Sequence, residues 1–381
     1  MSRKVILTGN GLSVGLNKDF ALPNITKRFF ERLPTEHKSF VKHHMDKLGK
    51  GDYIQTDFEE AIASIEQTYD SLKNYYDFLV KGEDGDEFLK AYDLGRTEIE
   101  RHLEAIQEII YEYTSSILDL IDGHVRWKEI GEKLSGFIEW LTVNIEEADQ
   151  IDLFTLNFDL LLETILLETI GTDRFLDYHA RGEKWPLIDN DLRYSFSPDL
   201  SMLLYGKRNV RLHHLHGSLS SFKNIKDGKL FKITTEALRY HQVYDEILEL
   251  DIVPSIVTGG GKSVKIQQNP FQFYYKEFKR NLVNEERLCE ELYIIGYSFR
   301  DDHINKDIAT RLSYERKKDN PKMLNKLLIV DYKTTDEEKK IFIDEINTAL
   351  GLGPRMANRF KYDDERIIFT GANSLSSLIK S

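Results

Sequence analysis

Short apolar runs, most of them ending at Gly, Asn or Asp, recur at wide spacing along this chain. Runs of this kind are typical of buried parallel strands, because helices cover both faces of such a sheet. Helical stretches, such as 273–289 and 335–350, lie between most of the runs. Alternating strands and helices predict an α/β fold with a doubly wound parallel sheet. The expected strands are 4–9, 151–157, 210–217, 251–259, 291–298, 327–332 and 366–371.

Residues 30–148 follow a different pattern, in which apolar side chains recur every three or four residues. This spacing predicts amphipathic helices. The apolar stripes run from Phe58 to Leu79, from Ile99 to Leu120 and from Trp127 to Leu141. Thr56 and Glu59 have the spacing of a capping box at the start of the first helix. We expect an inserted helical bundle at 30–148, and an α/β domain formed by 1–29 and 149–381.

Composition narrows the classes of function. A formal net charge of −12 argues against direct nucleic-acid binding, which needs a concentrated positive field. The single cysteine, Cys289, excludes an intrachain disulfide and a cysteine-based zinc ribbon. The start MSRKVILTGN leads directly into an expected strand, so we expect no signal peptide. No apolar run approaches the roughly 20 residues of a membrane helix, so we expect a cytoplasmic protein without membrane contact.

The stretch Thr155-Leu156-Asn157-Phe158-Asp159 follows an expected strand and precedes an expected helix. Asp159 has the position of a helix N-cap. Alternatively, Asn157 and Asp159 lie in the crevice at the carboxyl end of a parallel strand, where open α/β sheets bind ligands. The stretch alone leaves both interpretations open.

Two glycine-rich segments resemble nucleotide-binding loops without matching their patterns. In LTGNGLSVG, Gly9 and Gly11 form G-x-G, but the next expected glycine position holds Val14. The segment indicates either a phosphate-binding turn or a tight connection from strand to helix. In GGGKS at 259–263, the position of the first Walker glycine is Ile256, so we expect a flexible loop over the edge of the sheet instead of an ATPase site.

Several polar side chains near the ends of later strands are candidates for chemistry. Alternation along RLHHLHGSLS puts His214 and His216 on one face and His213 on the other, with no carboxylate or cysteine nearby to complete a metal site. Gly217 indicates that His216 lies at the open end of its strand, where it can act as a base.

Two further strand ends carry polar groups in a similar position. In IIGYSFRDDHIN, either Gly296 and Ser298 contact a ribose or phosphate, or Asp301 or Asp302 simply caps the next helix. Asp331 lies at the end of another strand and suits an adenosine hydroxyl, or is a plain strand terminus.

Taken in order, four motifs resemble the NAD-binding core of the sirtuins, which has a Rossmann-like fold. Sirtuins carry Gly-Ala-Gly-x-Ser, Thr-Gln-Asn-x-Asp and a catalytic His-Gly. The form GYSF-x-D-x-x-I-N is similar to the bacterial sirtuin-like branch of anti-phage defence, above all to the sirtuin-like partner of a HerA-type ATPase. The motifs are Gly9-Asn10-Gly11-Leu12-Ser13, Thr155-Leu156-Asn157-Phe158-Asp159, Leu215-His216-Gly217 and Gly296-Tyr297-Ser298.

The resemblance implies an NAD⁺ hydrolase that releases nicotinamide and ADP-ribose and depletes NAD⁺ in abortive infection. NAD⁺ is the substrate, and no metal is expected. We expect Asn157 to offer both an amide donor and an acceptor to a ribose hydroxyl and a water. Asp159 is expected to orient the Asn157 amide or to place negative potential near the developing cation. His216 is expected to act as general base. The candidate NAD⁺-binding residues are Gly9, Asn10, Gly11, Ser13, Thr155, Gly296, Tyr297, Ser298 and Asp331.

The chain also departs from the deacylating sirtuins. These enzymes have a four-cysteine zinc module and a Pro-Asp-Phe-Arg segment, whereas Asp19-Phe20 is followed here by Ala21. A deacylase or ADP-ribosyltransferase, and a scaffold that binds NAD or ADP-ribose without turnover, remain alternatives. The long apolar stripes and the need to restrain NAD⁺ consumption lead us to expect a homo-oligomer with a separate ATPase subunit. The resemblance alone implies that this subunit is a HerA-type ATPase. Alternatively, the helices only close a small satellite core around the cleft.

Overall fold

The chain divides into two compact units in a computed structural model. The first comprises Met1–Lys18, Ile121–Ile256 and Ile266–Ser381, and the second comprises Asp19–Leu120 and Val257–Lys265. The structure describes residues 2–47, 59–82, 84–92, 95–172, 174–184, 192–198, 209–224, 227–234, 252–257, 265–284, 286–314, 323–356 and 358–379.

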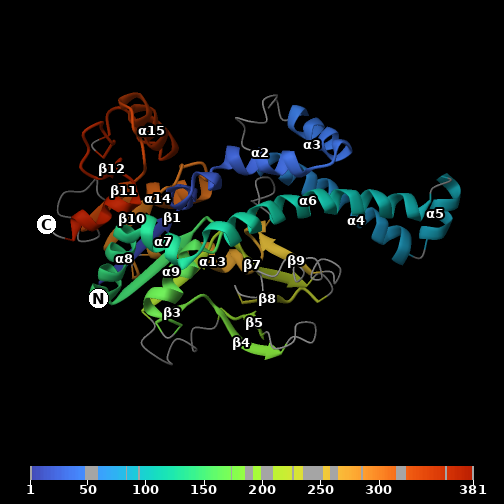
Figure 1. Ribbon diagram of the computed structural model, residues 1–381, viewed down its shortest axis with the longest axis horizontal. Coiled ribbons are helices and arrows are strands. Elements are labelled where there is room, and N and C mark those ends of the chain that lie inside the picture. Colours follow the sequence, from blue (N-terminus) through green and yellow to red (C-terminus); the bar gives the residue numbers. More distant parts are fainter. Residues whose placement is uncertain are drawn as a thin grey trace. The chain divides into compact units, whose positions relative to one another are not determined.

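A parallel sheet of seven strands forms the centre of the first unit, in the order β12-β11-β10-β1-β2-β6-β3 (Figure 1). Every neighbouring pair in this sheet runs parallel, which confirms the predicted α/β fold with a Rossmann-like sheet. Its strands are β1 (Arg3–Thr8), β2 (Gln150–Thr155), β3 (Phe175–Leu176), β6 (Val210–His214), β10 (Glu291–Ile295), β11 (Lys326–Val330) and β12 (Ile367–Ile368).

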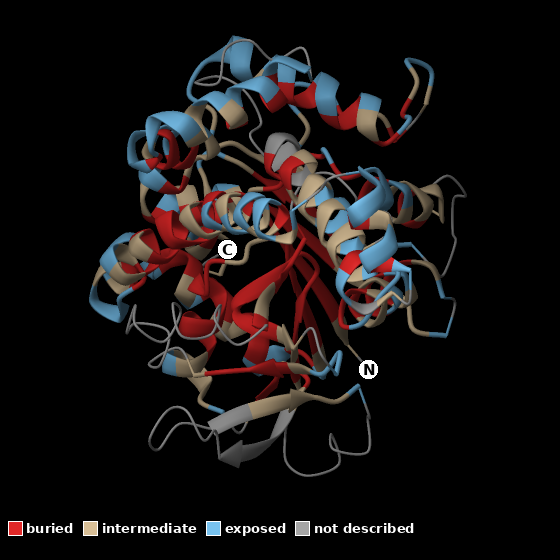
Figure 2. Cartoon of the chain, turned by 90° about the vertical axis from the view of Figure 1, so that its right-hand side faces the viewer, coloured by how far each residue is buried: buried red, intermediate tan, exposed pale blue. Residues whose placement is uncertain are grey.

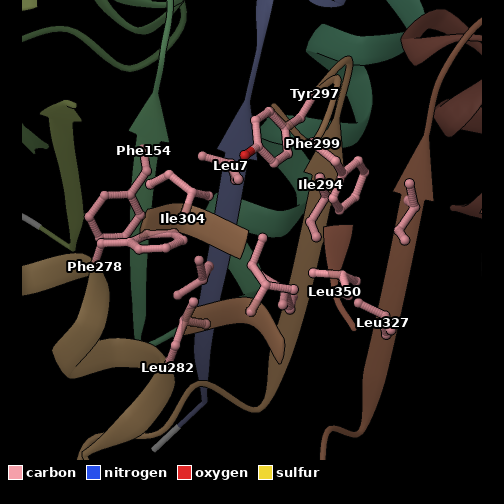
Figure 3. Packing of buried hydrophobic residues seen from close by; sticks show 14 of the residues in the cluster. Leu7, Phe154, Phe278, Leu282, Ile294, Tyr297, Phe299, Ile304, Leu327 and Leu350 are labelled. Carbon is pink, nitrogen blue, oxygen red and sulfur yellow. The ribbon is translucent and has the colours of Figure 1, made fainter. Parts of the chain in front are cut away.

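Helices cover both faces of this sheet, which explains why its strands are apolar without alternation. Phe154 and Ile294 point to the face on which the core residues of α13, α14 and α15 gather, as Figure 3 shows in part. On the opposite face, Tyr293 of β10 makes an edge contact with Trp140 of α8, with 4.9 Å between ring centroids. Figure 2 shows the buried strands in red between helices whose outer faces are exposed. These helices are α1 (Asn10–Leu16), α7 (Trp127–Lys133), α8 (Ser135–Glu147), α9 (Leu161–Ile170), α13 (Phe271–Val283), α14 (Asp302–Ser313) and α15 (Asp336–Ala349).

A second, antiparallel sheet of the first unit was not predicted. Its order is β4-β5-β8-β7-β9, and β9 occupies most of the run 251–259 that we expected in the parallel sheet. That expectation is wrong, because an apolar run does not reveal its pairing partner. The pair Asp227-Gly228 between β7 and β8 is a hairpin signal that could have revealed this sheet. The strands are β4 (His179–Lys184), β5 (Leu192–Phe196), β7 (Gly217–Asn224), β8 (Leu230–Lys232) and β9 (Ile252–Ile256).

The first two of the predicted amphipathic helices are confirmed, as α4 and α6. The third is wrong, because the stripe from Trp127 to Leu141 breaks into α7 and α8 at Leu134 (φ −120°, ψ 21°). There the N–H of Gly136 donates to Asn373 Oδ1 at 2.6 Å, so a contact with the short helix η4 (Ala372–Leu378) fixes the start of α8. The helices that begin in the second unit are α2 (Leu22–Arg32), α3 (Thr35–Lys47), α4 (Glu59–Lys81), α5 (Gly85–Tyr92) and α6 (Arg96–His124).

Some expectations lie outside the described residues or stay untested. Thr56, Phe58 and the GGGKS loop at 259–263 belong to stretches that the structure does not describe. The predicted division into domains at 30–148 stays a prediction, although α7 and α8 fall within the first compact unit. Across the described residues, we find no helix with the length and apolar character needed to cross a membrane.

Candidate functional site

The carboxyl ends of five neighbouring strands lie in one row of the parallel sheet. Each predicted motif begins within two residues of this row, so segments far apart in the sequence meet at one edge. The chain passes from β1 to β2 on one side and later to β10 on the other side of β1. Open α/β sheets bind ligands at this kind of change in strand order. Strand pairing aligns Val330, Ile295, Thr8, Thr155 and His214.

Close contact between two backbone turns explains the glycines after β1 and β10. The N–H of Gly9 donates to Ile295 O, and the N–H of Gly11 donates to Gly296 O, both at 2.9 Å. A Cβ at Gly11 would lie 2.6 Å from Gly296 Cα, and Gly296 itself has φ +63°. The Gly11 N–H therefore serves the contact between the turns instead of facing a phosphate.

Asn157 lies just beyond β2 with its amide fixed by two hydrogen bonds. Its Nδ2 donates to Gly9 O at 3.0 Å and to Ser13 Oγ at 2.8 Å. Because Gly9 O can only accept, the amide nitrogen must face it, and both of its hydrogens are used. Within the described part of the chain, Oδ1 of Asn157 has no protein partner. The amide therefore presents only an acceptor, whereas we expected both a donor and an acceptor.

Asp159 is buried and holds this arrangement from behind. Ser13 Oγ donates to Asp159 Oδ2, and the backbone N–H of Leu161 donates to Asp159 Oδ1 at 3.1 Å. Burial raises the pKa of Asp159, while the Ser13 hydrogen bond opposes that rise. Leu160, at the N-cap of α9, has φ +62°, a strained conformation that is common beside functional sites. Asp159 therefore bonds the first turn of α9 and orients Asn157 through Ser13.

His216 lies on the tight turn between β6 and β7. The N–H of Leu215 donates to Thr155 O at 2.9 Å, which holds this turn against the end of β2. Gly217 has φ +88°, and a Cβ there would lie 2.0 Å from a carbonyl oxygen of β9, so only glycine fits after His216. His216 Nε2 lies 3.6 Å from Asp301 Oδ2, and both side chains are buried.

The other two histidines of this segment are structural. His213 is stacked on Phe154, and its Nε2 lies 3.0 Å from Asp152 Oδ1. His214 faces the opposite side of the sheet, as predicted, and burial, followed by the charge of Lys232, lowers its pKa to about 3. No group of three His, Cys, Asp or Glu side chains that could hold a metal occurs among the residues described.

A buried ionic cluster beneath this region was not predicted. Lys232 Nζ of β8 lies 2.6 Å from Glu163 Oε1 of α9 and 2.6 Å from Asp177 Oδ2. The nearby Lys232 ammonium holds the pKa of Asp177 far below its usual range despite burial. The cluster thus joins the antiparallel sheet to α9. No sequence spacing connects these three residues.

The remaining candidates divide into buried supports and outer groups. Thr155 is buried, and its Oγ1 accepts the backbone N–H of Asn157 at 3.1 Å. The Tyr297 side chain belongs to the apolar core (Figure 3), whereas Ser298 is exposed and Asn10 is half-buried. Asp331 Oδ2 lies 3.2 Å from Lys333 Nζ. The side chain of Tyr297 is therefore part of the core and not a ligand contact.

Comparison with known proteins connects this geometry to one family. A family model described as SIR2-like domain matches residues 152–350, just over half of the chain. The match includes Asn157, Asp159, His216 and Gly296, and the glycine turn after β1 precedes it. A search of curated proteins found no match.

Proposed function

Because the chain belongs to the SIR2-like domain family, whose members are commonly NAD-related enzymes, we propose that it hydrolyses NAD⁺ to nicotinamide and ADP-ribose. The observation that carries the proposal is the fixed amide of Asn157. Both of its hydrogens are bonded to the protein, and its oxygen remains for a ligand at the sheet edge where His216 lies.

Breaking the nicotinamide bond requires little acid catalysis, because the leaving pyridinium already carries positive charge. The ribose that remains has oxocarbenium character, so an enzyme needs to hold it and to direct a nucleophile. Asn157 Oδ1 accepts a hydrogen bond from a ribose hydroxyl or from the attacking water. An acceptor dipole held in place before the reaction also favours a neighbouring cation without the cost of reorientation.

His216 is the general base of this proposal. Its imidazole, with the carboxylate of Asp301 nearby, can take a proton from the water or from a ribose hydroxyl. Asp159 acts at one remove, because its carboxylate bonds Ser13 and a backbone N–H in the interior instead of facing the ligand. We therefore give Asp159 and Ser13 the role of positioning Asn157.

Water is the acceptor that best suits this chain. The only cysteine, Cys289, is buried in the apolar core, so the four-cysteine module of deacylating sirtuins has no counterpart here. The arginine of the Pro-Asp-Phe-Arg segment is also replaced, by Ala21. These differences favour hydrolysis over transfer to an acyl-lysine.

The proposal extends to a biological role and a partner on family resemblance alone. We propose that NAD⁺ depletion by this protein serves anti-phage defence, and that a homo-oligomer with a HerA-type ATPase restrains the activity until infection. An unrestrained NAD⁺ hydrolase would harm the cell that makes it, so control from outside the chain is part of the proposal.

The test follows nicotinamide release from NAD⁺ by purified protein, with and without a HerA-type ATPase. We expect His216→Ala to reduce turnover by about 10²–10⁴-fold, the usual contribution of a general base. His303→Ala removes an exposed histidine of α14 and should leave turnover unchanged. Equal turnover of both variants would reject the site, and binding of NAD⁺ without nicotinamide release would favour the scaffold alternative.

A further inference from the structure

We propose that Asp301 is a positioning residue for His216, which holds the imidazole ring and stabilises its protonated form during catalysis. The inference rests on the proposed function of this site for its catalytic meaning. His216 comes from the turn after β6, and Asp301 comes from the loop after β10, yet Oδ2 of Asp301 lies 3.6 Å from Nε2 of His216.

The direction of the Asp301 carboxylate is unusual for its place in the chain. Asp301 is the N-cap residue of α14, where an aspartate normally accepts a hydrogen bond from an N–H of the first helical turn. Here the side chain makes no capping hydrogen bond. The carboxylate forgoes this stabilisation, typically about 1 kcal/mol, and is directed to His216.

A buried hydrogen-bond network fixes the backbone that carries Asp301. The N–H of Asp301 donates to Tyr297 Oη at 3.2 Å, and Tyr297 Oη donates to Asn305 Oδ1 at 2.9 Å. Asn305 Nδ2 in turn donates to Phe299 O at 2.8 Å, and the N–H of Asn305 donates to Asp301 O at 2.9 Å. The loop between β10 and α14 is thus held at both ends.

Backbone strain in the same loop supports this interpretation. Phe299 has φ +56°, a conformation that costs a bulky residue about 1–2 kcal/mol. A plain connection to α14 has no need for a strained residue, for two buried polar side chains that bond the loop backbone and for an aspartate that does not cap its helix. All of these features are explained if the loop must deliver a carboxylate to His216.

The expected effect on chemistry follows from charge. When His216 takes a proton, it becomes an imidazolium in a buried environment, which is costly without a nearby negative charge. A carboxylate that holds the ring and stabilises this cation raises the rate of the chemical step, as in other pairs of histidine and aspartate. It contributes little to substrate binding, so its loss should change kcat rather than KM.

The test compares Asp301→Asn with Asp302→Asn, a matched change at the adjacent exposed position in the first turn of α14. We expect Asp301→Asn to lower kcat at least about 10-fold with little change in KM, and Asp302→Asn to match the wild type. In a His216→Ala background, Asp301→Asn should cost nothing further, because its role acts through the ring. An additive loss in that background, or equal kcat for both single variants, would overturn the proposal.

A second readout needs no turnover. The ring ¹⁵N signals of His216, assigned by their loss in His216→Ala, should shift in Asp301→Asn and stay unchanged in Asp302→Asn. Unchanged signals in Asp301→Asn would overturn the proposal even if kcat fell. If the wild-type protein releases no nicotinamide, the proposed function fails. The ring signals of His216 then test the contact between Asp301 and His216 by themselves. If Asp301→Asn does not fold, Asp301→Ser removes the charge and keeps a side chain suited to a helix N-cap.

Discussion

At the scale of single residues, the account depends on the direction of one amide. Asn157 donates both hydrogens of its side chain to the protein, so its identity as an amide is fixed by Gly9 O and Ser13 Oγ. The residue type and its position were predictable from the motif. Its direction was not, because the glycine turn that accepts from it lies 148 positions earlier in the chain.

We therefore predict that Asn157→Asp is as damaging as Asn157→Ala. The isosteric carboxylate would place a second acceptor against Gly9 O and lose both hydrogen bonds, each worth about 1 kcal/mol or more when buried. We expect nicotinamide release to fall by about 10²-fold or more in both variants. Asn325→Asp, at an exposed position, is the control. Substantial turnover by Asn157→Asp would show that the amide hydrogens are not needed.

The buried state of His214 predicts a dependence of stability on pH. Its pKa is lowered to about 3 in the folded protein, against 6.5 for an ordinary histidine. Above pH 6.5 the ring is neutral in both states; as the pH falls toward 3, the unfolded chain takes up a proton that the folded chain does not. The free energy of unfolding should therefore fall across this window, by an amount on the order of a few kcal/mol.

Urea unfolding between pH 7 and pH 4 measures this contribution. We expect the wild type to lose more stability over that range than His214→Gln, because the variant has no imidazole to protonate on unfolding. His303→Gln, at an exposed position, should follow the wild-type curve. Parallel curves for the wild type and His214→Gln would contradict the interpretation of His214 as a buried neutral ring.

At the scale of elements, local sequence patterns predicted the positions of most strands of the parallel sheet and of several helices. Apolar runs located every strand of the parallel sheet except β3. Helical spacing located α4, α6, α13 and α15. The pairing of strands was harder to predict from the sequence, because the apolar run that forms β9 is compatible with either sheet. The break between α7 and α8 also depends on a contact with η4, more than 230 positions away.

A contact between two turns gives a prediction at this scale. Gly296 (φ +63°) and Gly228 (φ +69°) share a left-handed backbone. Of these two, only Gly296 lacks space for a side chain, because a Cβ there would lie 2.5 Å from Leu12 N. We expect Gly228→Ala to lower the free energy of unfolding by about 1 kcal/mol, and Gly296→Ala by about 3 kcal/mol or more, because backbone must also move. Chemical denaturation of both variants provides the comparison. Equal losses would contradict the close packing of the two turns.

At the scale of the whole molecule, the buried ionic cluster joins the antiparallel sheet to helix α9, and no sequence pattern connects these two parts. Lys232 of the antiparallel sheet pairs with Glu163 of α9, directly after the turn that carries Asn157 and Asp159. The antiparallel sheet therefore supports the site although it contributes no predicted catalytic residue. Sequence patterns reveal burial and periodicity. They do not reveal that three charged residues far apart in the chain form one cluster, so this support could not be predicted.

Assembly gives a prediction at this scale. We expect the protein to form a homo-oligomer and to associate with a HerA-type ATPase. Light scattering at micromolar concentration should then give a mass that is a multiple of 44.5 kDa, and a larger one with the ATPase. A monomer both alone and in the mixture would contradict this expectation and leave the proposed hydrolysis to be judged on its own.

The central claim is that this sheet edge breaks the nicotinamide bond of NAD⁺ with water as acceptor. The most direct measurement is chromatography of both products after incubation of the wild type and Asn157→Ala with NAD⁺, with and without the ATPase. The account predicts equal amounts of nicotinamide and ADP-ribose from the wild type, in at least one of these conditions, and almost none from the variant. Intact NAD⁺ in every condition, or nicotinamide without an equal amount of ADP-ribose, would contradict it.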